Sequence, residues 1–357
     1  MLPYYLLAFI PPTISYFFCS REQDKKRRIT FAIVLFFAGF ICLLACRDLS
    51  IGVDNSTYKS MFELNSKLSL EEIFKNSKIE QGYALLNKIV SIISENYQFF
   101  VAIVAIISVI PIAIMYVKES ESSVLTLALF LTTGIFSMYF SGLRQIIAMA
   151  FVVPAYYFTK NKKPIWFIVT VALATLFHQS AFIMLIFYPV YRTKITTKKF
   201  LFIIPAVLIG YIFNAQIFTL LLKFMGERYE DRYGVVESTG AITMIILFAL
   251  FVVYSYFIVD ENKFSSDDFG LRNILIICLI FQLFAPVNSV AMRMNYYFIP
   301  FIPLTIPKMA NRCRDNYKQL AWLSVGIMSV FFMLYFIYDA HTGADILQVF
   351  PYKAFWN

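Results

Sequence analysis

Three arginines interrupt an otherwise apolar chain, each at the edge of a stretch long enough to cross a bilayer: Arg47, Arg144 and Arg293. A charged side chain close to hydrocarbon is costly, so its presence there calls for an explanation. The basic loops considered below place all three on the non-cytoplasmic side. Three guanidinium groups on one membrane face predict a site for an anionic, phosphate-bearing, lipid-linked substrate, because arginine binds phosphate through paired hydrogen bonds.

Each arginine also has a simpler interpretation. Arg144 follows Gly142 and opens a span, where an arginine often extends its head toward water. External span ends disfavour positive charge, however, and a helix N-terminus suits an anion. Arg293, with Tyr296 nearby, resembles an interfacial anchor flanked by asparagines. Arg47 can pair with the neighbouring Asp48.

His178 stands between Phe177 and Gln179 in an apolar stretch. A lone histidine in such a stretch is more often a satisfied core group than a catalyst. At the tip of a membrane hairpin it can accept a proton from a sugar hydroxyl. Carboxylates in the predicted loops, Asp54 and Glu80 among them, are alternative proton acceptors, although a solvated surface is their default. The spacing does not choose between them.

The composition indicates one integral membrane domain over residues 1–357. The chain is 60% hydrophobic and 15% charged, with a mean hydropathy of +0.69, whereas soluble domains carry about 25% charged residues. The net charge of +9 lies in short loops between spans, so it is no sign of nucleic-acid binding. Five cysteines without a CxxC spacing predict neither disulfides nor zinc. No nucleotide loop or other cofactor motif is present, which indicates a donor already activated in the membrane.

A crossing helix needs roughly 20 residues. The apolar stretches of that kind are 2–19, 29–46, 98–117, 123–141, 143–159, 200–222, 241–259, 271–288, 293–309 and 318–338. With 164–190 they predict an all-α protein with about 10 to 12 membrane helices. The basic run 21–28 must be cytoplasmic, which places the N-terminus and residues 47–97 outside.

The stretch 164–190 has two interpretations. If it crosses once, the basic clusters at 192–199 and 308–318 lie outside, against the positive-inside rule. If it enters and returns as a short hairpin that turns near His178, both clusters lie inside and the C-terminus lies outside. We favour the hairpin, which is permitted where protein or water covers its backbone.

Two external loops follow from this topology. The loop 47–97 opens with a polar turn, then predicts a helix at 69–76 capped by Ser69, and an amphipathic helix at 83–94 that lies in the membrane interface. The loop 223–240 carries further charges, including Arg232.

Several short motifs, taken in order, resemble one family. They are Arg47-Asp48 with Gly52-Val53-Asp54 and Tyr58, then Glu80-Gln81-Gly82-Tyr83, Gly142-Leu143-Arg144-Gln145, Phe177-His178-Gln179-Ser180, and Arg293 with its tyrosine pair. The chain resembles the EpsG family over roughly residues 30–310, and that family is similar to the Wzy-type polymerases of O-antigen, capsule and exopolysaccharide. Family members commonly have Gly-Thr-Asp where this chain has Gly52-Val53-Asp54.

The resemblance implies a metal-independent glycosyltransferase of the bacterial inner membrane, with a GT-C-like architecture and a periplasmic active site. It would move a growing glycan from undecaprenyl diphosphate to the non-reducing end of a lipid-linked repeat unit, alongside a chain-length regulator protein. We expect Arg144 and Arg293 to bind the diphosphate, Arg47 to add supporting charge, and His178 to accept the hydroxyl proton. The remaining substrate-binding residues expected are Asp54, Tyr58, Glu80, Gln145, Arg232 and Tyr296.

Three competing functions remain open. A flippase of lipid-linked sugars would spread its charges through the mid-membrane and show a repeat between its halves, which we do not see. A ligase that delivers the finished glycan shares the donor chemistry, so the sequence discriminates it poorly. A membrane acyltransferase would call for a histidine motif on the cytoplasmic side.

Overall fold

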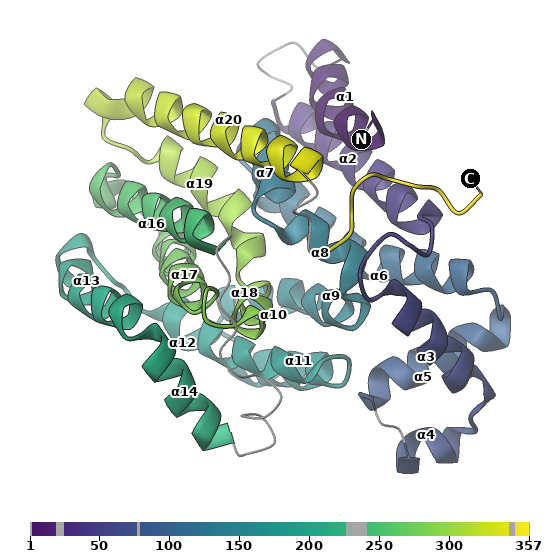
Figure 1. The fold of residues 1–357 in the computed structure, drawn as a ribbon. Helices are drawn as coiled ribbons and strands as arrows, with labels where there is room; N and C mark the ends of the chain where they lie inside the picture. The colour runs from purple at the N-terminus through teal and green to yellow at the C-terminus, as the bar shows by residue number, and fades with distance from the viewer. Residues whose placement is uncertain (1, 19–24, 77–78, 226–240, 343–346, 357) are drawn as a thin grey trace. The chain divides into compact units, whose positions relative to one another are not determined.

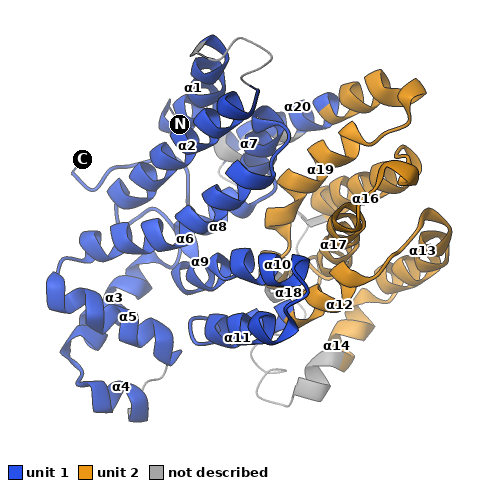
Figure 2. Ribbon diagram, turned by 180° about the vertical axis from the view of Figure 1, so that it is seen from behind, with its two compact units in different colours: residues 1–184, 326–357 blue, residues 185–325 orange. Residues whose placement is uncertain are grey.

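The computed structural model describes residues 2–18, 25–76, 79–225, 241–342 and 347–356. Within these ranges the chain is helical, and its only β-type contacts are two isolated bridges. It divides into two compact units, residues 1–184 with 326–357, and residues 185–325 (Figures 1 and 2). Each unit is described below by itself.

The first unit contains most of the N-terminal helices and the last helix of the chain. Its elements are α1 (Leu2–Phe18), α2 (Lys25–Cys46), α3 (Asn55–Lys67), α4 (Leu70–Asn76), α5 (Gln81–Ile93), α6 (Tyr97–Glu119), α7 (Ser123–Thr132), α8 (Ile135–Ser141), α9 (Leu143–Ala150), α10 (Val152–Lys160) and α11 (Pro164–Thr175). The 3-10 helix η2 (Gln179–Ile186) and α20 (Lys318–Thr342) run across the boundaries between the units.

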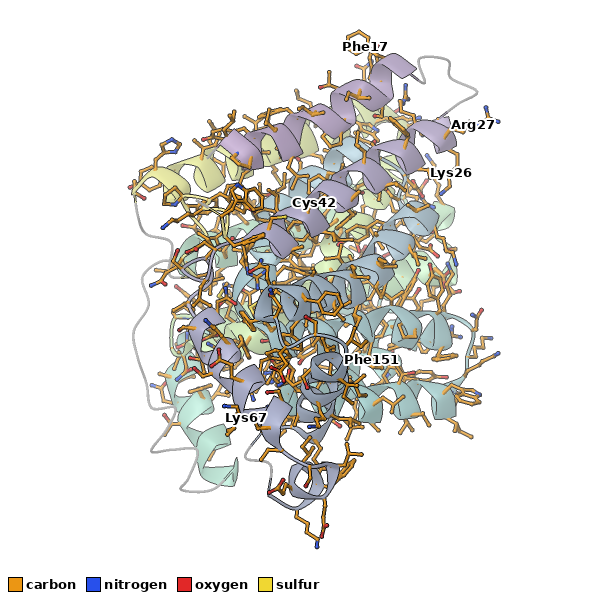
Figure 3. The ribbon with its side chains drawn as sticks, turned by 90° about the vertical axis from the view of Figure 1, so that its right-hand side faces the viewer. Phe17, Lys26, Arg27, Cys42, Lys67 and Phe151 are labelled. Carbon is orange, nitrogen blue, oxygen red and sulfur yellow. The ribbon has the colours of Figure 1, made fainter. Side chains whose placement is uncertain are left out.

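The antiparallel pair α2 and α6 gives the first unit two polar ends. At one end Lys26 donates to the carbonyls of Val117 and Lys118, and Lys160 pairs with Glu119 at 3.0 Å. At the other end the Gln98 side chain donates to the carbonyls of Ala45 and Arg47. Figure 3 shows Lys26 and Arg27 where α2 begins and Cys42 farther along the helix. The 22 residues of α2 span about 33 Å, so an apolar layer of membrane thickness separates the ends.

Several of the predicted membrane spans are bent or interrupted in the structure. In the described ranges, two helices are long and apolar enough to cross a bilayer, α2 and α6, and there are four if two bent helix pairs each count as one span. The pair α7 and α8 bends by 54°, where Gly134 adopts a positive φ of 83°. The predicted single helix 143–159 is interrupted at Phe151, between α9 and α10.

The predicted span 293–309 is wrong as a single helix. The chain forms a short α18 (Ser289–Asn295), a 3-10 turn η4 (Ile299–Phe301) and then α19 (Ile302–Asn311). Pro300 and Pro303 lie at the starts of the two later elements. Because proline lacks a backbone N–H, it is tolerated at a helix start and interrupts a longer one.

The helix in the stretch 164–190 is interrupted at its polar residues. The helix α11 ends at Thr175, a turn follows, and η2 begins at Gln179. The 12 residues of α11 extend only about 18 Å, less than a full crossing of the hydrocarbon core. The break coincides with the predicted turning point, while the sense in which the chain crosses stays a prediction.

The second unit begins with the remainder of η2 and ends within α20. Besides α18, η4 and α19, its elements are α12 (Phe187–Arg192), α13 (Thr197–Ile212), α14 (Asn214–Met225), α16 (Ala241–Phe257), η3 (Glu261–Lys263), α17 (Ser266–Leu283) and η5 (Asp315–Tyr317). The helices α13 and α14 meet at an angle of 80°, so the predicted span 200–222 is bent.

A charged network closes one end of the second unit. Arg272 is fully buried, and its Nη2 atom lies 2.7 Å both from the carbonyl oxygen of Ile195 and from a carboxylate oxygen of Glu261. Arg312 pairs with Asp268 at 2.9 Å. These bonds place the segments that carry the two basic clusters, 192–199 and 308–318, at the same end. Both interpretations of 164–190 require that arrangement.

The loop 47–97 folds into three helices. Ser69 caps α4 as predicted, with a reciprocal pair of bonds to Glu72. The helix α5 covers the predicted amphipathic segment and leaves Ile92 and Ile93 exposed. The structure adds α3, for which the sequence predicted no helix; only its first residues fall in the predicted polar turn.

Candidate active site

Glu80 is held next to the end of α11 by a close contact between main chains. The residue immediately precedes α5, and two positions later the N–H of Gly82 donates to the carbonyl of Leu176 at 2.8 Å. A Cβ atom on residue 82 would lie 2.7 Å from that carbonyl oxygen. Glycine therefore permits an approach that brings the Glu80 carboxylate to the turn containing His178.

The carboxylate of Glu80 joins two residues that the sequence singled out separately. Its Oε2 atom lies 2.6 Å from Nη1 of Arg144, and its Oε1 atom lies 3.3 Å from Nδ1 of His178. The backbone N–H of Gln179 also donates to Oε1, at 3.3 Å. The side chains are partly shielded, with exposed fractions of 25% for Arg144, 20% for His178 and 10% for Glu80. The cluster is thus sheltered yet reachable from solvent.

Arg144 lies in the first turn of α9, directly after the junction at Gly142. Its guanidinium carbon lies 5.9 Å from the centroid of the Tyr58 ring, on α3. Burial raises the pKa of the Tyr58 hydroxyl, and the nearby positive charge of Arg144 opposes that rise. Tyr58 in turn packs edge-on against the buried Tyr83 at 5.8 Å between ring centroids. The cation therefore rests between a carboxylate and an aromatic layer.

The electrostatics fix the ionisation of Glu80. Burial raises the pKa of its carboxyl group, but the hydrogen bond from His178 and the charge of Arg144 outweigh burial and lower that pKa to about 2. An ionised carboxylate only accepts hydrogen bonds, so the proton on Nδ1 of His178 points at Glu80. Neutral His178 then carries its lone pair on Nε2. A carboxylate that orients an imidazole in this way equips it to accept a proton from a hydroxyl group.

Asp54 lies beside the same junction. Its Oδ2 atom is 3.5 Å from the hydroxyl of Ser141, the residue before Gly142. Asp54 occupies the cap position of α3 but makes no side-chain capping bond there. The predicted residues Asp54, Tyr58, Glu80, Arg144 and His178 therefore belong to the region where α3, α5, α9 and the end of α11 meet.

Arg47 occupies a different environment from the one predicted. Its side chain is 2% exposed, donates to the carbonyl of Leu44 at 3.3 Å, and lies 5.8 Å from the centroid of the Phe140 ring. The simpler alternative, a pairing of Arg47 with Asp48, is not what the structure has, because the Asp48 carboxylate accepts from the backbone N–H and hydroxyl of Ser50. The Nε and Nη2 atoms of Arg47 have no hydrogen-bond partner among the described residues. Direct substrate binding by Arg47 remains a prediction that would require its cover to move.

The other predicted residues are located as follows. Gln145, on α9, is buried with 3% of its surface exposed. Arg293 and Tyr296 belong to the second unit, where Arg293 is exposed and Tyr296 is buried at 3%. Arg232 and most of the loop 223–240 lie outside the described residues. The convergence of the three arginines stays a prediction.

Sequence reasoning named Glu80 as a candidate but missed that its carboxylate links Arg144 to His178. It also missed Tyr83 and Asn87, two buried polar residues of α5 whose side-chain polar atoms have no partner among the described residues. The signal available was the compact run Glu80-Gln81-Gly82-Tyr83 at a helix start. In the ranges that the structure describes, no group of three or more His, Cys, Asp or Glu side chains is arranged to hold a metal ion.

One comparison with known proteins identifies a relationship. A family model described as the EpsG family matches residues 29–354, nearly the whole chain. Neither the curated proteins nor the solved structures contain a match.

Proposed function

This chain belongs to the EpsG family, a Wzy-like polymerase-type family, and from that premise we propose that it is a polysaccharide repeat-unit polymerase. At the coarse level the family supports a glycosyltransferase-like activity in a membrane protein. The finer proposal is that the enzyme transfers a growing glycan from undecaprenyl diphosphate to a fresh lipid-linked repeat unit, without a metal ion. The observation that carries it is the bridge that Glu80 makes between Arg144 and His178.

The proposed reaction has one nucleophile and one leaving group. A hydroxyl at the non-reducing end of the acceptor repeat unit attacks the anomeric carbon of the donor glycan. Nε2 of His178 takes the hydroxyl proton as the new C–O bond forms, and Glu80 stabilises the resulting imidazolium. The bond from the anomeric carbon to the diphosphate oxygen breaks, and the electron pair leaves with the lipid diphosphate.

Arg144 would stabilise that departing anion. One of its nitrogens is engaged by Glu80, which fixes the orientation of the guanidinium plane. Its Nε atom is buried, and the Tyr58 hydroxyl also hydrogen-bonds the guanidinium, so we propose that the N–H donors left on the two terminal nitrogens bind phosphate oxygens. Fixed positive charge in a site with little water is commonly a large catalytic contribution. We propose that Arg293 supplies a second cation to the diphosphate, and that Asp54, Tyr58, Gln145, Arg232 and Tyr296 help to form the glycan site.

We place the Arg144 end of the first unit on the periplasmic face of the bacterial inner membrane. The support is the positive-inside rule: the opposite end gathers Lys26, Lys118 and Lys160, which follow or precede short basic loops. This orientation belongs to an all-α membrane protein with about 10 to 12 crossing or dipping segments and a GT-C-like architecture, in which 164–190 dips and returns. A chain-length regulator protein would act beside it.

The test is complementation of a strain that lacks the gene, with the surface polysaccharide resolved by size on a gel. Wild type should restore a ladder of long chains. Arg144→Ala and His178→Ala should give protein of normal abundance and leave only single-unit glycan. His341→Ala is the matched control, because His341 is exposed and, among the residues that the structure describes, its ring bonds the carbonyl of Ile337 one turn earlier. Normal ladders from both site variants would exclude the proposed mechanism.

A further inference from the structure

The segment 347–356, which we name the C-terminal strap, runs antiparallel to residues 46–53. The main-chain hydrogen bonds between the two are Asp48 N to Lys353 O (2.8 Å), Gly52 N to Gln348 O (2.9 Å), Val53 N to Leu347 O (3.0 Å) and Phe355 N to Cys46 O (3.0 Å). Arg47 and Ala354 form an isolated antiparallel bridge within this pairing. The strap therefore fixes the external segment that follows α2.

Side chains tie the strap to the helical core of the first unit. The Tyr4 hydroxyl, on α1, donates to the carbonyl of Val349 at 2.7 Å, and Val349 itself is fully buried. The Tyr352 hydroxyl donates to the carbonyl of Leu43, on α2, at 3.0 Å. The strap is thus packed into the unit rather than loosely attached to its surface.

The segment held by the strap lies directly against the start of the Arg144 helix. Gly52 has a φ of 94°, and a Cβ atom there would lie 2.0 Å from the carbonyl oxygen of Phe140. Two residues later, Asp54 approaches Ser141. Both contacts fall immediately before Gly142, the residue that precedes α9.

Asn55 transmits the same constraint to the other side of Arg144. Its side-chain NH₂ donates to the carbonyls of Asp48 and Leu49 at 3.4 and 3.3 Å, and its Oδ1 accepts from the Tyr97 hydroxyl at 2.6 Å. Asn55 is 2% exposed and begins α3, the helix that carries Tyr58 to the Arg144 guanidinium. The orientation of Arg144 thus depends on two contacts that both start from residues 48–55.

We propose that the C-terminal strap supports the active site from outside, and that Asn55 is a positioning residue through which the strap orients Arg144. This inference rests on the polymerase function proposed above. It assigns no direct contact with substrate to the strap. The inference also implies that the strap stays in place during the reaction, so that Arg47 remains buried and does not contact the lipid diphosphate.

The first experiment removes the strap or its link. Two variants are assayed with lipid-linked repeat unit isolated from the deletion strain. The first is a chain that stops before Leu347. The second is the near-isosteric Asn55→Asp, which loses the NH₂ donor but keeps Oδ1. Because an error of about 1 Å in a catalytic group costs on the order of 100-fold, we expect kcat to fall by roughly 10- to 100-fold with KM for the acceptor nearly unchanged. A synthetic 347–357 peptide should restore part of the rate to the shortened chain. Wild-type kcat in both variants would overturn the proposal.

The second experiment holds the strap closed. The antiparallel pairing sets residues 48 and 353 opposite each other, at a separation of about 5.5 Å between Cα atoms, within the range for a disulfide. Asp48→Cys with Lys353→Cys, made in a chain whose native cysteines are replaced, should retain full activity when oxidised. If the oxidised protein is inactive and reduction restores it, the strap must open for catalysis, and the positioning role is excluded.

A third measurement separates this inference from the polymerase function. Hydrogen exchange of residues 48–58 in the purified protein reports the strap without any assay of glycan. Removing the strap should raise exchange there while the α2–α6 pair stays protected. If removing the strap raises exchange at residues 48–58 but the wild-type protein makes no polymer, the positioning role of the strap is supported and the polymerase function is rejected. If removing the strap leaves hydrogen exchange at residues 48–58 unchanged, the proposed positioning role of the strap is rejected.

Discussion

The Nη1 atom of Arg144 lies 2.6 Å from the Oε2 atom of Glu80, although 64 residues separate the two in the chain. The same carboxylate contacts His178, a further 34 positions beyond Arg144. The pairing sets the charge of the site close to zero when the imidazole is neutral. An arriving lipid diphosphate would therefore meet a cation already oriented by its partner, which lowers the reorganisation needed in the transition state.

The first prediction concerns Glu80→Gln. The amide keeps the shape but removes the charge that orients His178 and stabilises its protonated form. We expect polymerisation to fall on the order of 100-fold or more, the scale of a lost general base, with normal protein abundance. The measurement is the rate of chain growth on purified lipid-linked repeat unit.

The matched control for that variant is Glu119→Gln, which breaks the ion pair with Lys160 at the opposite end of the first unit. It should leave the rate of chain growth unchanged. Equal losses in the two variants would show that Glu80 matters only for folding.

The second prediction separates geometry from charge at Arg144. Arg144→Lys keeps the positive charge but loses the planar fork, so one amine cannot serve both Glu80 and a phosphate oxygen in the same way. We expect a loss of roughly 10- to 100-fold, smaller than the loss of about 100- to 1000-fold expected for Arg144→Ala. Glycan ladders from the complemented strain give the order of the variants. Full activity with lysine would argue against fork binding.

The third prediction is a pH dependence of stability. The pKa of Glu80 is about 2 in the folded protein against an ordinary value of 4.5, so its ionised form stabilises the fold. That contribution is present above about pH 4.5 and is lost as the pH falls toward 2. Thermal unfolding of the purified protein should therefore show wild type more stable than Glu80→Gln at neutral pH, with the difference shrinking in acid.

A constant difference across that pH range would contradict the lowered pKa of Glu80. Glu71→Gln serves as the reference, because Glu71 pairs with Lys75 on an exposed face of α4. Its melting temperature should differ little from that of wild type at any of these pH values.

The fourth prediction concerns the close approach at Gly52. Gly52→Ala adds a Cβ that must avoid the Phe140 carbonyl at a positive φ, so we expect a loss of about 1–3 kcal/mol in stability and a marked loss of activity. Gly326→Ala is the control, because among the described residues nothing outside its own turn of helix lies within 4 Å of the Cβ that would be added there. That variant should be neutral or slightly stabilising, by roughly 0.5–1 kcal/mol. Equal melting temperatures for Gly52→Ala and wild type would show that the segment can move away.

The fifth prediction is topological. Reporter fusions after residues 161, 195 and 314 should all report the cytoplasm, and a fusion after residue 356 should report the outside. An external signal at 195 would remove the hairpin at 164–190. An internal signal at 356 would contradict the strap, since the strap pairs with the segment that bears Arg47.

Much of the helical architecture could be predicted from hydropathy, because apolar stretches of membrane length are long-range averages that single residues do not disturb. The breaks could not. The chain bends at Gly134 and its helix is interrupted at Phe151, and neither feature changes the hydropathy of the stretch. The helix α3 was missed because its polar residues outnumber the buried face formed by Tyr58, Phe62 and Asn65, although these recur at helical spacing.

The residues of the site were easier to predict than their contacts. Arg144 and His178 stood out because charge and imidazole are rare in apolar sequence. Glu80 was named among the candidates, but a loop carboxylate is usually solvated, and nothing in its spacing shows that the contact of Gly82 with Leu176 brings its carboxylate to His178. The burial of Arg47 was equally hidden, because the segment that pairs with its backbone comes from the far end of the chain and the aromatic rings near its side chain lie far from it in sequence.

The two polar ends of the first unit have a consequence for the lipid around it. In the membrane placement that we propose, the ion pair of Lys160 with Glu119 and the cluster around Glu80 mark the limits within which hydrocarbon surrounds the helices. A bilayer thinner than that layer would leave apolar rings in water, and a thicker one would draw charged groups into hydrocarbon or force the helices to tilt. The activity of this protein should therefore depend on the acyl chain length of the lipid, and it should be greatest in vesicles whose hydrophobic thickness matches the length of α2.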